Sequence, residues 1–410
     1  MSNWPFRFIH AADFHLETPP FGVEEVPEHL TELLLEAAYW SASTVFETAL
    51  AEKVDFVVLS GDLLHSRHTG PRGPLFLVEQ FERLAERNIA VYWAGGRIDP
   101  PEAWPASMLL PENVYVFGRG KPEQCIHRRD DTALARLIGA SRPAEGKIRP
   151  KGFDAEHPGL FSIAVAHGRW RLELLKAARV DYWALGGGHA RRTLCESMPV
   201  VHDPGSPQGR HPEETGPHGC TLVEVDLERN TRLTFMPTDA IRWECPRIVL
   251  DETSTPEGLE HEMVRRVESL RQSSPKTDFL ISWNLGGAGS VVNEARRGTL
   301  GAKLLGRLRE RFGHGPPAAW SVAIAVDPSA RAAASWYEED TIRGEFLREL
   351  REREKAVDEP LDLEDVLPEK GTDDALRKLL LHPPEASRLA LLGEAATLGV
   401  DLLDGEEAES

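Results

Sequence analysis

The stretch FRFIHAADFH, residues 6–15, sets an apolar strand directly before two side chains of metal-binding type, Asp13 and His15. Residues two apart on an extended segment face the same side, so both can approach one ion. Similar strand ends recur further along the chain, in DFVVLSGD (55–62), FSIAVAHG (161–168) and DYWALGGG (181–188), and they supply Asp62, His167 and His189. The pattern predicts metal ligands at the ends of several strands.

Helical patterns separate these strands, at about 28–52, 73–88 and 171–179, and IAVYWAGG (89–96) is a further strand. Strands that alternate with helices indicate a largely parallel or mixed α/β sheet. In open sheets of this kind, ligands bind beyond the carboxyl ends of the strands. The five metal-binding side chains are therefore expected close together.

The later segments differ in character. Residues 198–244 contain close-spaced strands with few helix signals, and we expect them to complete a second sheet packed on the first. Residues 246–330 alternate again, with helices near 257–272 and 293–313, as in a small α/β domain. The sequence thus predicts three domains, at 1–245, 246–332 and 333–410.

The net charge of −19 argues against a protein that binds nucleic acid indiscriminately. Much of it belongs to the tail, because residues 338–410 carry 22 acidic and 9 basic side chains, so a local basic groove remains compatible with the sequence. No apolar run of membrane-spanning length and no signal peptide are expected. Four cysteines without a C-x-x-C pair indicate a reduced, cytoplasmic protein.

A mixture of carboxylate and imidazole ligands suits Mn, Fe or Zn better than Ca or Mg. Two such ions about 3.5–4 Å apart form the usual clamp for phosphoester hydrolysis, and a carboxylate such as Asp62 can bridge them. Taken singly, each motif has a structural alternative: a G-D at a strand end is often a turn, and a lone His is often a core residue. Their order and spacing together favour a metal site.

The series D-F-H, G-D-L-L-H, H-G and G-x-H resembles the calcineurin-like metallophosphoesterases, and among them the DNA double-strand-break repair exonucleases of the SbcD and YhaO type. DPGSPQGRHPEETGPHGCTLVEV (203–225) and DAIRWE (239–244) are the more specific matches. The resemblance implies a four-layer αββα sandwich, a small α/β capping domain and C-terminal helices that bind a coiled-coil ATPase.

The resemblance also implies the ligands of two ions. One ion would be held by Asp13, His15, Asp62 and His189, which are all present. The other would use Asp62, an Asn, His167 and a second His.

Two motifs depart from the family pattern. AGGRIDPP (94–101) stands where G-N-H-D is expected, so Gly96 and Arg97 replace a ligand Asn and the His that assists the transition state. G-G-G-H stands in place of G-H-x-H, so Gly187 replaces a ligand His. We therefore expect at most one tightly bound ion, Mn²⁺ or else Fe or Zn, and no certain catalytic residue.

Further candidates for contact with phosphate or the site are His65, Arg97, Arg191, Arg210 and His211, although each has an alternative as a loop or surface residue. Two functions remain open. The chain is either a weakly active or inactive subunit that binds DNA ends with an SbcC-like ATPase, or an active exonuclease with a rebuilt or single-metal site. A homodimer is compatible with both.

The tail carries an apolar stripe on a helix at about 340–355, formed by Ile342, Phe346, Leu347 and Leu350. A polar linker separates it from a second helix, whose apolar face includes Leu389, Leu392 and Leu403. Such stripes either cover the capping domain or form a partner site. We expect part of the tail to bind the coiled-coil base of the ATPase.

Overall fold

The computed structural model describes residues 4–23, 26–65, 70–143, 150–154, 159–327, 333–356 and 385–405. The chain divides into two compact units. Unit 1 comprises the chain up to Glu244 together with Thr277–Phe279, and unit 2 comprises the remainder from Cys245 onward.

Unit 1 is built on two six-stranded sheets in the described part of the chain. The first has the order β12-β11-β1-β2-β3-β4 and consists of β1 (Phe6–Ala11), β2 (Phe56–Leu59), β3 (Ala90–Trp93), β4 (Val114–Val116), β11 (Gly219–Val225) and β12 (Thr231–Pro237). The second has the order β5-β6-β7-β8-β10-β9 and consists of β5 (Glu123–Arg129), β6 (Thr132–Ala140), β7 (Phe161–His167), β8 (Tyr182–Gly186), β9 (Arg192–Cys195) and β10 (Val200–Asp203).

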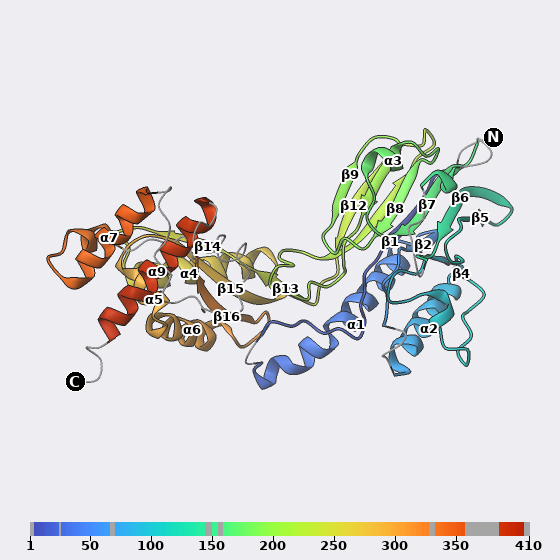
Figure 1. Ribbon diagram of the computed structural model, residues 1–410. Coiled ribbons are helices and arrows are strands. Elements are labelled where there is room, and N and C mark those ends of the chain that lie inside the picture. Colours follow the sequence, from blue (N-terminus) through green and yellow to red (C-terminus); the bar gives the residue numbers. More distant parts are fainter. Residues whose placement is uncertain are drawn as a thin grey trace. The chain divides into compact units, whose positions relative to one another are not determined.

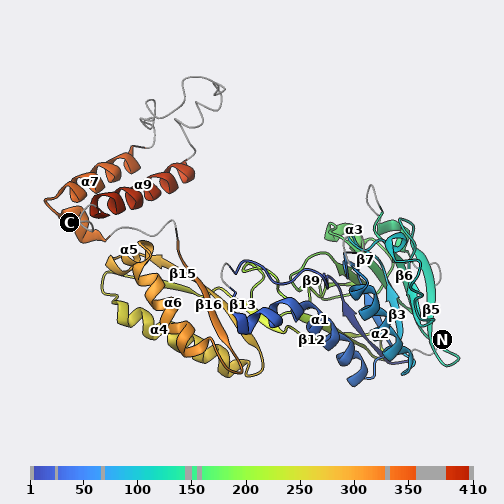
Figure 2. The same ribbon diagram turned by 90° about the horizontal axis from the view of Figure 1, so that it is seen from below.

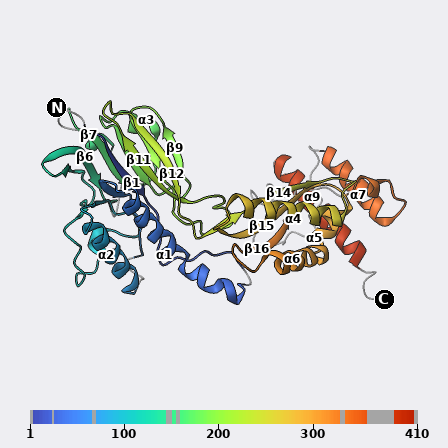
Figure 3. The same ribbon diagram turned by 180° about the vertical axis from the view of Figure 1, so that it is seen from behind.

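Helices cover the outer faces of the two sheets (Figures 1 and 3). Side chains of α1 (Glu28–Ala51) and α2 (Arg72–Ala85) share a buried cluster with Ile9 and Val57 of the first sheet. The adjacent residues of the same strands, Phe8 and Val58, face a second cluster, which also contains Ile163 of the second sheet. Short helix α3 (Leu172–Lys176) packs on the far face of the second sheet. Because residues along a strand alternate between faces, these strands separate two cores, and the predicted four-layer αββα sandwich is confirmed.

Two expectations for unit 1 were wrong or incomplete. Strands β11 and β12 extend the first sheet, because β11 pairs antiparallel with β1, whereas only β9 and β10 join the second. Strands β4, β5 and β6 were not expected. A tight turn, with Asp130 at a φ of 53°, joins β5 and β6, and β5 is a polar edge strand that lacks a clear apolar alternation.

Unit 2 contains a smaller α/β layer in which β15 (Asp278–Gly287) pairs with β14 (Arg247–Leu250) and with β16 (Ala319–Val326). Helices α4 (Pro256–Ser273), α5 (Ser290–Arg296) and α6 (Thr299–Phe312) accompany these strands (Figure 2). The single helix expected at 293–313 is interrupted at Gly298, whose φ of 90° lies outside the right-handed helical range.

The described part of the tail is a pair of helices, α7 (Ile342–Lys355) and α9 (Glu385–Gly405), which lie side by side (Figure 2). Phe346 of α7 packs over Gly399 of α9, where an added Cβ would lie 2.2 Å from the ring. Most of the polar linker expected between the helices lies outside the described residues. None of the described helices has the length and apolar character needed to cross a lipid bilayer.

Candidate metal centre

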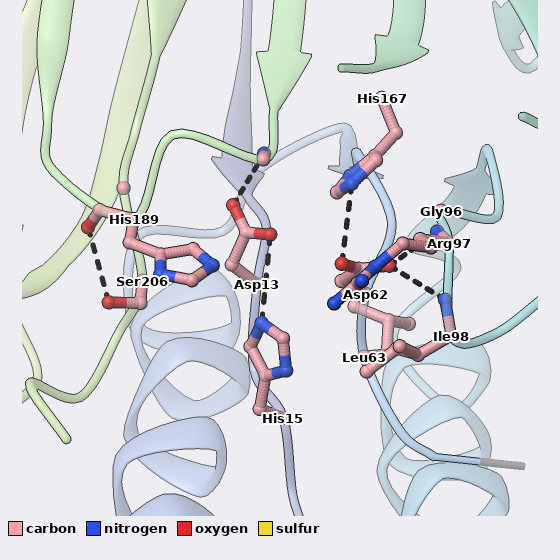
Figure 4. A network of polar contacts seen from close by, with 12 residues as sticks. Asp13, His15, Asp62, Leu63, Gly96, Arg97, Ile98, His167, His189 and Ser206 are labelled. Atoms are coloured by element: carbon pink, nitrogen blue, oxygen red, sulfur yellow. Dashed lines mark hydrogen bonds and ion pairs between the residues drawn. The ribbon is translucent and has the colours of Figure 1, made fainter. Parts of the chain in front are cut away.

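The five side chains predicted as ligands converge at the carboxyl ends of four strands (Figure 4). Asp13 and His15 follow β1, Asp62 follows β2, His167 is the last residue of β7, and His189 follows β8. Strands β1 and β2 are parallel neighbours in one sheet, as are β7 and β8 in the other. The donors therefore meet where the ends of the two sheets face each other.

The donors form two groups among the residues that the structure describes. Asp13, His15 and His189 make one, and Asp13, Asp62 and His167 make the other, with ligand atoms in each group within 4.8 Å of one another. Asp13 belongs to both. The sequence resemblance implies that Asp62 is shared between the two ions, and Asp62 lies in the second of these groups.

Four of the five donors have a left-handed backbone. The φ angles are 56° at Asp13, 47° at His15, 56° at Asp62 and 54° at His189. This region is sparsely populated by residues other than glycine, and such conformations cluster at functional sites. At Asp13 and His15 this backbone conformation is held by hydrogen bonds to the segment after β2. They run from Asp13 N to Gly61 O at 2.9 Å and from His15 N to Asp62 O at 3.1 Å.

Two buried polar atoms in this cluster have no hydrogen-bond partner. They are Asp13 Oδ1 and His15 Nε2, which lie 3.9 Å apart. The other oxygen of Asp13 accepts a hydrogen bond from Gly187 N at 2.7 Å. Because burying an unpaired polar atom is costly, a shared cation is the natural partner for both atoms, and these residues fit a metal ion.

The imidazole ring of His167 is also held with one nitrogen facing this cluster. Its Nδ1 donates to Ser60 O at 2.9 Å, so Nε2 faces Asp62 Oδ2 at 3.3 Å. Burial opposes a charge on this imidazole, but the Asp62 carboxylate raises its pKa to about 9. Burial likewise opposes ionisation of Asp62, yet hydrogen bonds from His167 and from the backbone of Ile98 hold its pKa below the usual range.

The first donor group has different protonation properties. Burial raises the pKa of Asp13 to about 7, with a contribution from Asp203. Burial and the neighbouring Arg210 guanidinium lower the pKa of His15 to about 3. Without a cation the site therefore favours neutral side chains, and a metal ion must displace a proton from Asp13 as it binds.

The loop that departs from the family pattern closes on Asp62. Asp62 Oδ1 accepts hydrogen bonds from the backbone N–H groups of Arg97, at 2.5 Å, and Ile98, at 3.0 Å. An added Cβ at Gly96 would lie 2.3 Å from the same oxygen. Peptide donors thus occupy Oδ1 of Asp62, whereas Oδ2 faces His167, and the loop leaves no space for a side chain at Gly96.

Asp99 holds this loop in place. Its carboxylate accepts from the backbone N–H of Asp62, Leu63 and Gly96 and from the Trp93 indole, at 2.6 to 3.1 Å. Both oxygens are occupied by these donors. Asp99 is therefore a structural clamp for the loop rather than a replacement ligand.

Gly187 occupies a similarly tight position. Its φ is 95°, and an added Cβ would lie 3.0 Å from His167 Nε2. A histidine here would need both a strained backbone and a displaced His167 ring.

The five further candidates differ in their surroundings. Arg210 is buried, with Nη2 3.2 Å from His189 Nδ1. Arg191 is exposed over the Phe235 ring and lines a 430 Å³ pocket with His189. Arg97 is exposed, the His65 backbone N–H binds Glu17, and His211 packs against the Phe21 ring.

Sequence reasoning missed two carboxylates at this centre, which are Asp203 and Glu214. Asp203 ends β10, and burial raises its pKa to about 6. Its position at a strand end was a usable signal, whereas Glu214 lies in a loop without such a mark.

A two-sheet α/β sandwich with Asp and His donors at the strand ends is the architecture of a metal-dependent phosphoesterase. No protein-family model matches the chain. The metallophosphoesterase YhaO of Bacillus subtilis, itself uncharacterized, is 30% identical over 308 residues, which cover 72% of this chain and 75% of the relative. The chain therefore belongs to the calcineurin-like metallophosphoesterases.

Two further similarities are more distant. The DNA double-strand break repair protein Mre11 of Sulfolobus acidocaldarius is 22% identical over 240 residues, covering 53% of this chain and 60% of that protein. A dimetal phosphatase from Danio rerio aligns with a TM-score of 0.33 and 12% identity, over 53% of this chain and 92% of the other.

Proposed function

We propose that the chain is a DNA-end-binding subunit with one tightly bound metal ion and weak or absent hydrolysis, working with an SbcC-like coiled-coil ATPase. The observation that carries this proposal is the closed loop at Asp62. Two peptide N–H groups occupy Asp62 Oδ1, and Gly96, at the place of the family's ligand Asn, has no space for a side chain.

Asp13, His15, Asp62 and His189 would hold the ion, and their mixed donors suit Mn²⁺, Fe or Zn. A bound divalent cation polarises a phosphoryl oxygen and lowers the pKa of a bound water. The chain itself supplies little to the later proton transfers. Arg97 stands at the place of the family's catalytic His, and a guanidinium is always charged, so it cannot exchange a proton with the substrate near neutral pH.

Exposed arginines favour a substrate rich in phosphate. Exposed arginines follow the carboxyl ends of β3, β7 and β8. They are Arg97, Arg169, Arg171, Arg191 and Arg192, of which the last begins β9. Guanidinium groups bind phosphate oxygens in pairs. Because the Mre11 relatives are named for DNA double-strand break repair, DNA ends are the substrate class that we assign.

Some apolar residues of the tail helices support the proposed ATPase partner, and others do not. Leu347 and Leu392 of the predicted stripes are buried and cannot serve as exposed anchors. Ile342, Leu389 and Leu403 stay exposed, as do three further leucines of α9, Leu391, Leu398 and Leu402. An apolar helix face of this kind is typical of a docking surface for a partner helix.

The alternative is an active metal-dependent exonuclease. The second donor group, of Asp13, Asp62 and His167, favours it because its ligand atoms also lie within 4.8 Å of one another. Two ions could then share Asp13.

For the cellular location, the four free cysteines favour a reducing compartment, and we propose the cytoplasm.

Metal content, DNA binding and cleavage together test the proposal. The full chain is loaded with Mn²⁺, freed of excess metal and analysed by elemental mass spectrometry. We expect one ion per chain, binding of linear DNA in preference to closed circles, and little cleavage. Two retained ions with Mn²⁺-dependent cleavage that Asp62→Ala abolishes would instead establish the exonuclease.

A further inference from the structure

The loop between β10 and β11 wraps around His189. Ser206 N donates to His189 O at 2.8 Å, and Ser206 Oγ donates to the same carbonyl at 3.2 Å. The chain passes so closely that an added Cβ at Gly205 would lie 2.7 Å from His189 O. The loop thereby holds the left-handed backbone of His189.

The same loop fixes the imidazole ring through Glu214. Glu214 Oε1 lies 2.9 Å from His189 Nδ1. An ionised carboxylate carries no hydrogen, so the hydrogen of this contact must be on Nδ1. His189 Nε2 then keeps its lone pair, and it is the nitrogen available to a metal ion.

Glu214 is itself held from several sides. Its second oxygen accepts from the Arg210 backbone N–H at 2.9 Å, and its backbone carbonyl accepts from His218 Nε2 at 3.2 Å. The Arg210 guanidinium is nine-tenths buried and lies 3.6 Å from Glu214 Oε1. Its Nη2 also lies 3.2 Å from His189 Nδ1. Since a guanidinium can only donate, the shorter contact with Glu214 places the hydrogen on Nδ1, and the Arg210 cation stabilises the carboxylate rather than binding the ring nitrogen.

We propose that Glu214 is a positioning residue for the metal ligand His189, with Arg210 holding the carboxylate in place. The inference rests on the proposed function, in which His189 binds the ion. A carboxylate that accepts from the far nitrogen of a ligating histidine fixes its tautomer and orientation, and losing it typically weakens metal binding about 10–100-fold. The alternative is that Glu214 only stabilises its loop.

Mn²⁺ affinity of the full chain separates these two roles. We would titrate Mn²⁺ into the metal-free wild type, Glu214→Gln, Glu214→Ala and Glu213→Gln by calorimetry, and record thermal unfolding of each metal-free protein. Glu213 is the matched control, because it is the adjacent residue and its side chain is 90% exposed.

We expect Glu214→Ala to weaken Mn²⁺ binding about 10–100-fold and also to lower the metal-free unfolding temperature, because the buried Arg210 guanidinium loses its carboxylate partner. Glu214→Gln should weaken binding less, because its amide oxygen still accepts from Nδ1, and it keeps the test valid if the Ala variant does not fold. Glu213→Gln should bind as the wild type does.

Wild-type affinity in both Glu214 variants would overturn this inference and leave the proposed metal site intact. A loss of unfolding temperature without a loss of affinity would also overturn it, in favour of the loop role. A wild-type chain that binds no Mn²⁺ at all would overturn the proposed function, and this inference with it.

Discussion

At the scale of single residues, the centre combines donors that suit a metal ion with a loop that leaves no space for a side chain at Gly96. The left-handed donors and the unpartnered atoms of Asp13 and His15 favour a cation. The contacts of Gly96 and Gly187 oppose a second one, because backbone and side-chain atoms already fill the space that the missing ligands would need.

The protonation of Asp13 predicts how metal affinity changes with pH. Since its metal-free pKa is about 7, a proton competes with the ion below pH 7, and Mn²⁺ affinity should rise about tenfold per pH unit from pH 5 to 7. His15, with a pKa of about 3, adds no slope in this range. Calorimetry across pH 5.5 to 8.5 checks this.

Above pH 7 the same titration tests His167. If the ion avoids this side chain, the affinity should level off near pH 7. If His167 binds the ion, its pKa of about 9 should keep the affinity rising to the end of the range. A flat profile from pH 5.5 upward would contradict the role of Asp13.

Restoring the family's residues should fail. We consider the triple variant Gly96→Asn, Arg97→His, Gly187→His. The new Cβ at position 96 would collide with Asp62, and the new Cβ at position 187 would crowd His167. Overpacking of this kind costs about 1–3 kcal/mol at each site. We expect lower stability to urea and no gain in Mn²⁺-dependent DNA cleavage.

Gly70→Asn is the control for the triple variant, because no atom lies within 4 Å of an added Cβ there. It should unfold at the same urea concentration as the wild type. Recovered nuclease activity in the triple variant would mean that the loop can open to rebuild the second ion site.

At the scale of elements, some apolar residues of the tail helices pack between α7 and α9, and others are exposed. Leu347, Leu392 and Val400 are buried, and the Phe346 ring sits over Gly399. Leu398 and Leu402 remain 62% and 67% exposed on α9. The predicted stripes contained buried Leu347 and Leu392 together with exposed Ile342 and Leu389, and only helix packing separates these two sets.

This division predicts a variant that keeps the helices and loses the partner. Leu398→Glu with Leu402→Glu should leave circular dichroism unchanged but abolish co-purification with the coiled-coil ATPase, because a charge on an apolar anchor opposes docking. Leu109→Glu, at a leucine of unit 1 that is 86% exposed, should bind normally. Binding by the double variant at wild-type strength would exclude α9 as the docking element.

At the scale of the whole molecule, deletion of residues 338–410 tests the division of labour. Unit 1 contains both sheets and every metal donor. The shortened chain should therefore keep its Mn²⁺ affinity and the thermal transition of unit 1 while losing the ATPase. A truncated chain that still co-purifies with the ATPase would contradict the docking assignment.

The sequence by itself determined the alternation of strands and helices and the donors that follow the strands, whereas the four-layer sandwich was implied by the family resemblance. Alternating strands and helices are local patterns, and Asp13, Asp62 and His189 each follow an apolar strand whose carboxyl end predicts their position. Several features depended on contacts between distant segments. Strand β11 pairs with β1 from more than 200 residues away, and Glu214 meets His189 only because the loop folds back over it.

The contacts of the loop at residues 96–98 with Asp62 were decided by tertiary structure as well. The sequence indicated that ligands of a second ion were missing, but not that peptide N–H groups of residues 97 and 98 take one oxygen of Asp62. Local patterns report which face of an element is buried. They carry no information about which backbone atoms from another segment will meet a given side chain, because that depends on the packed positions of both segments.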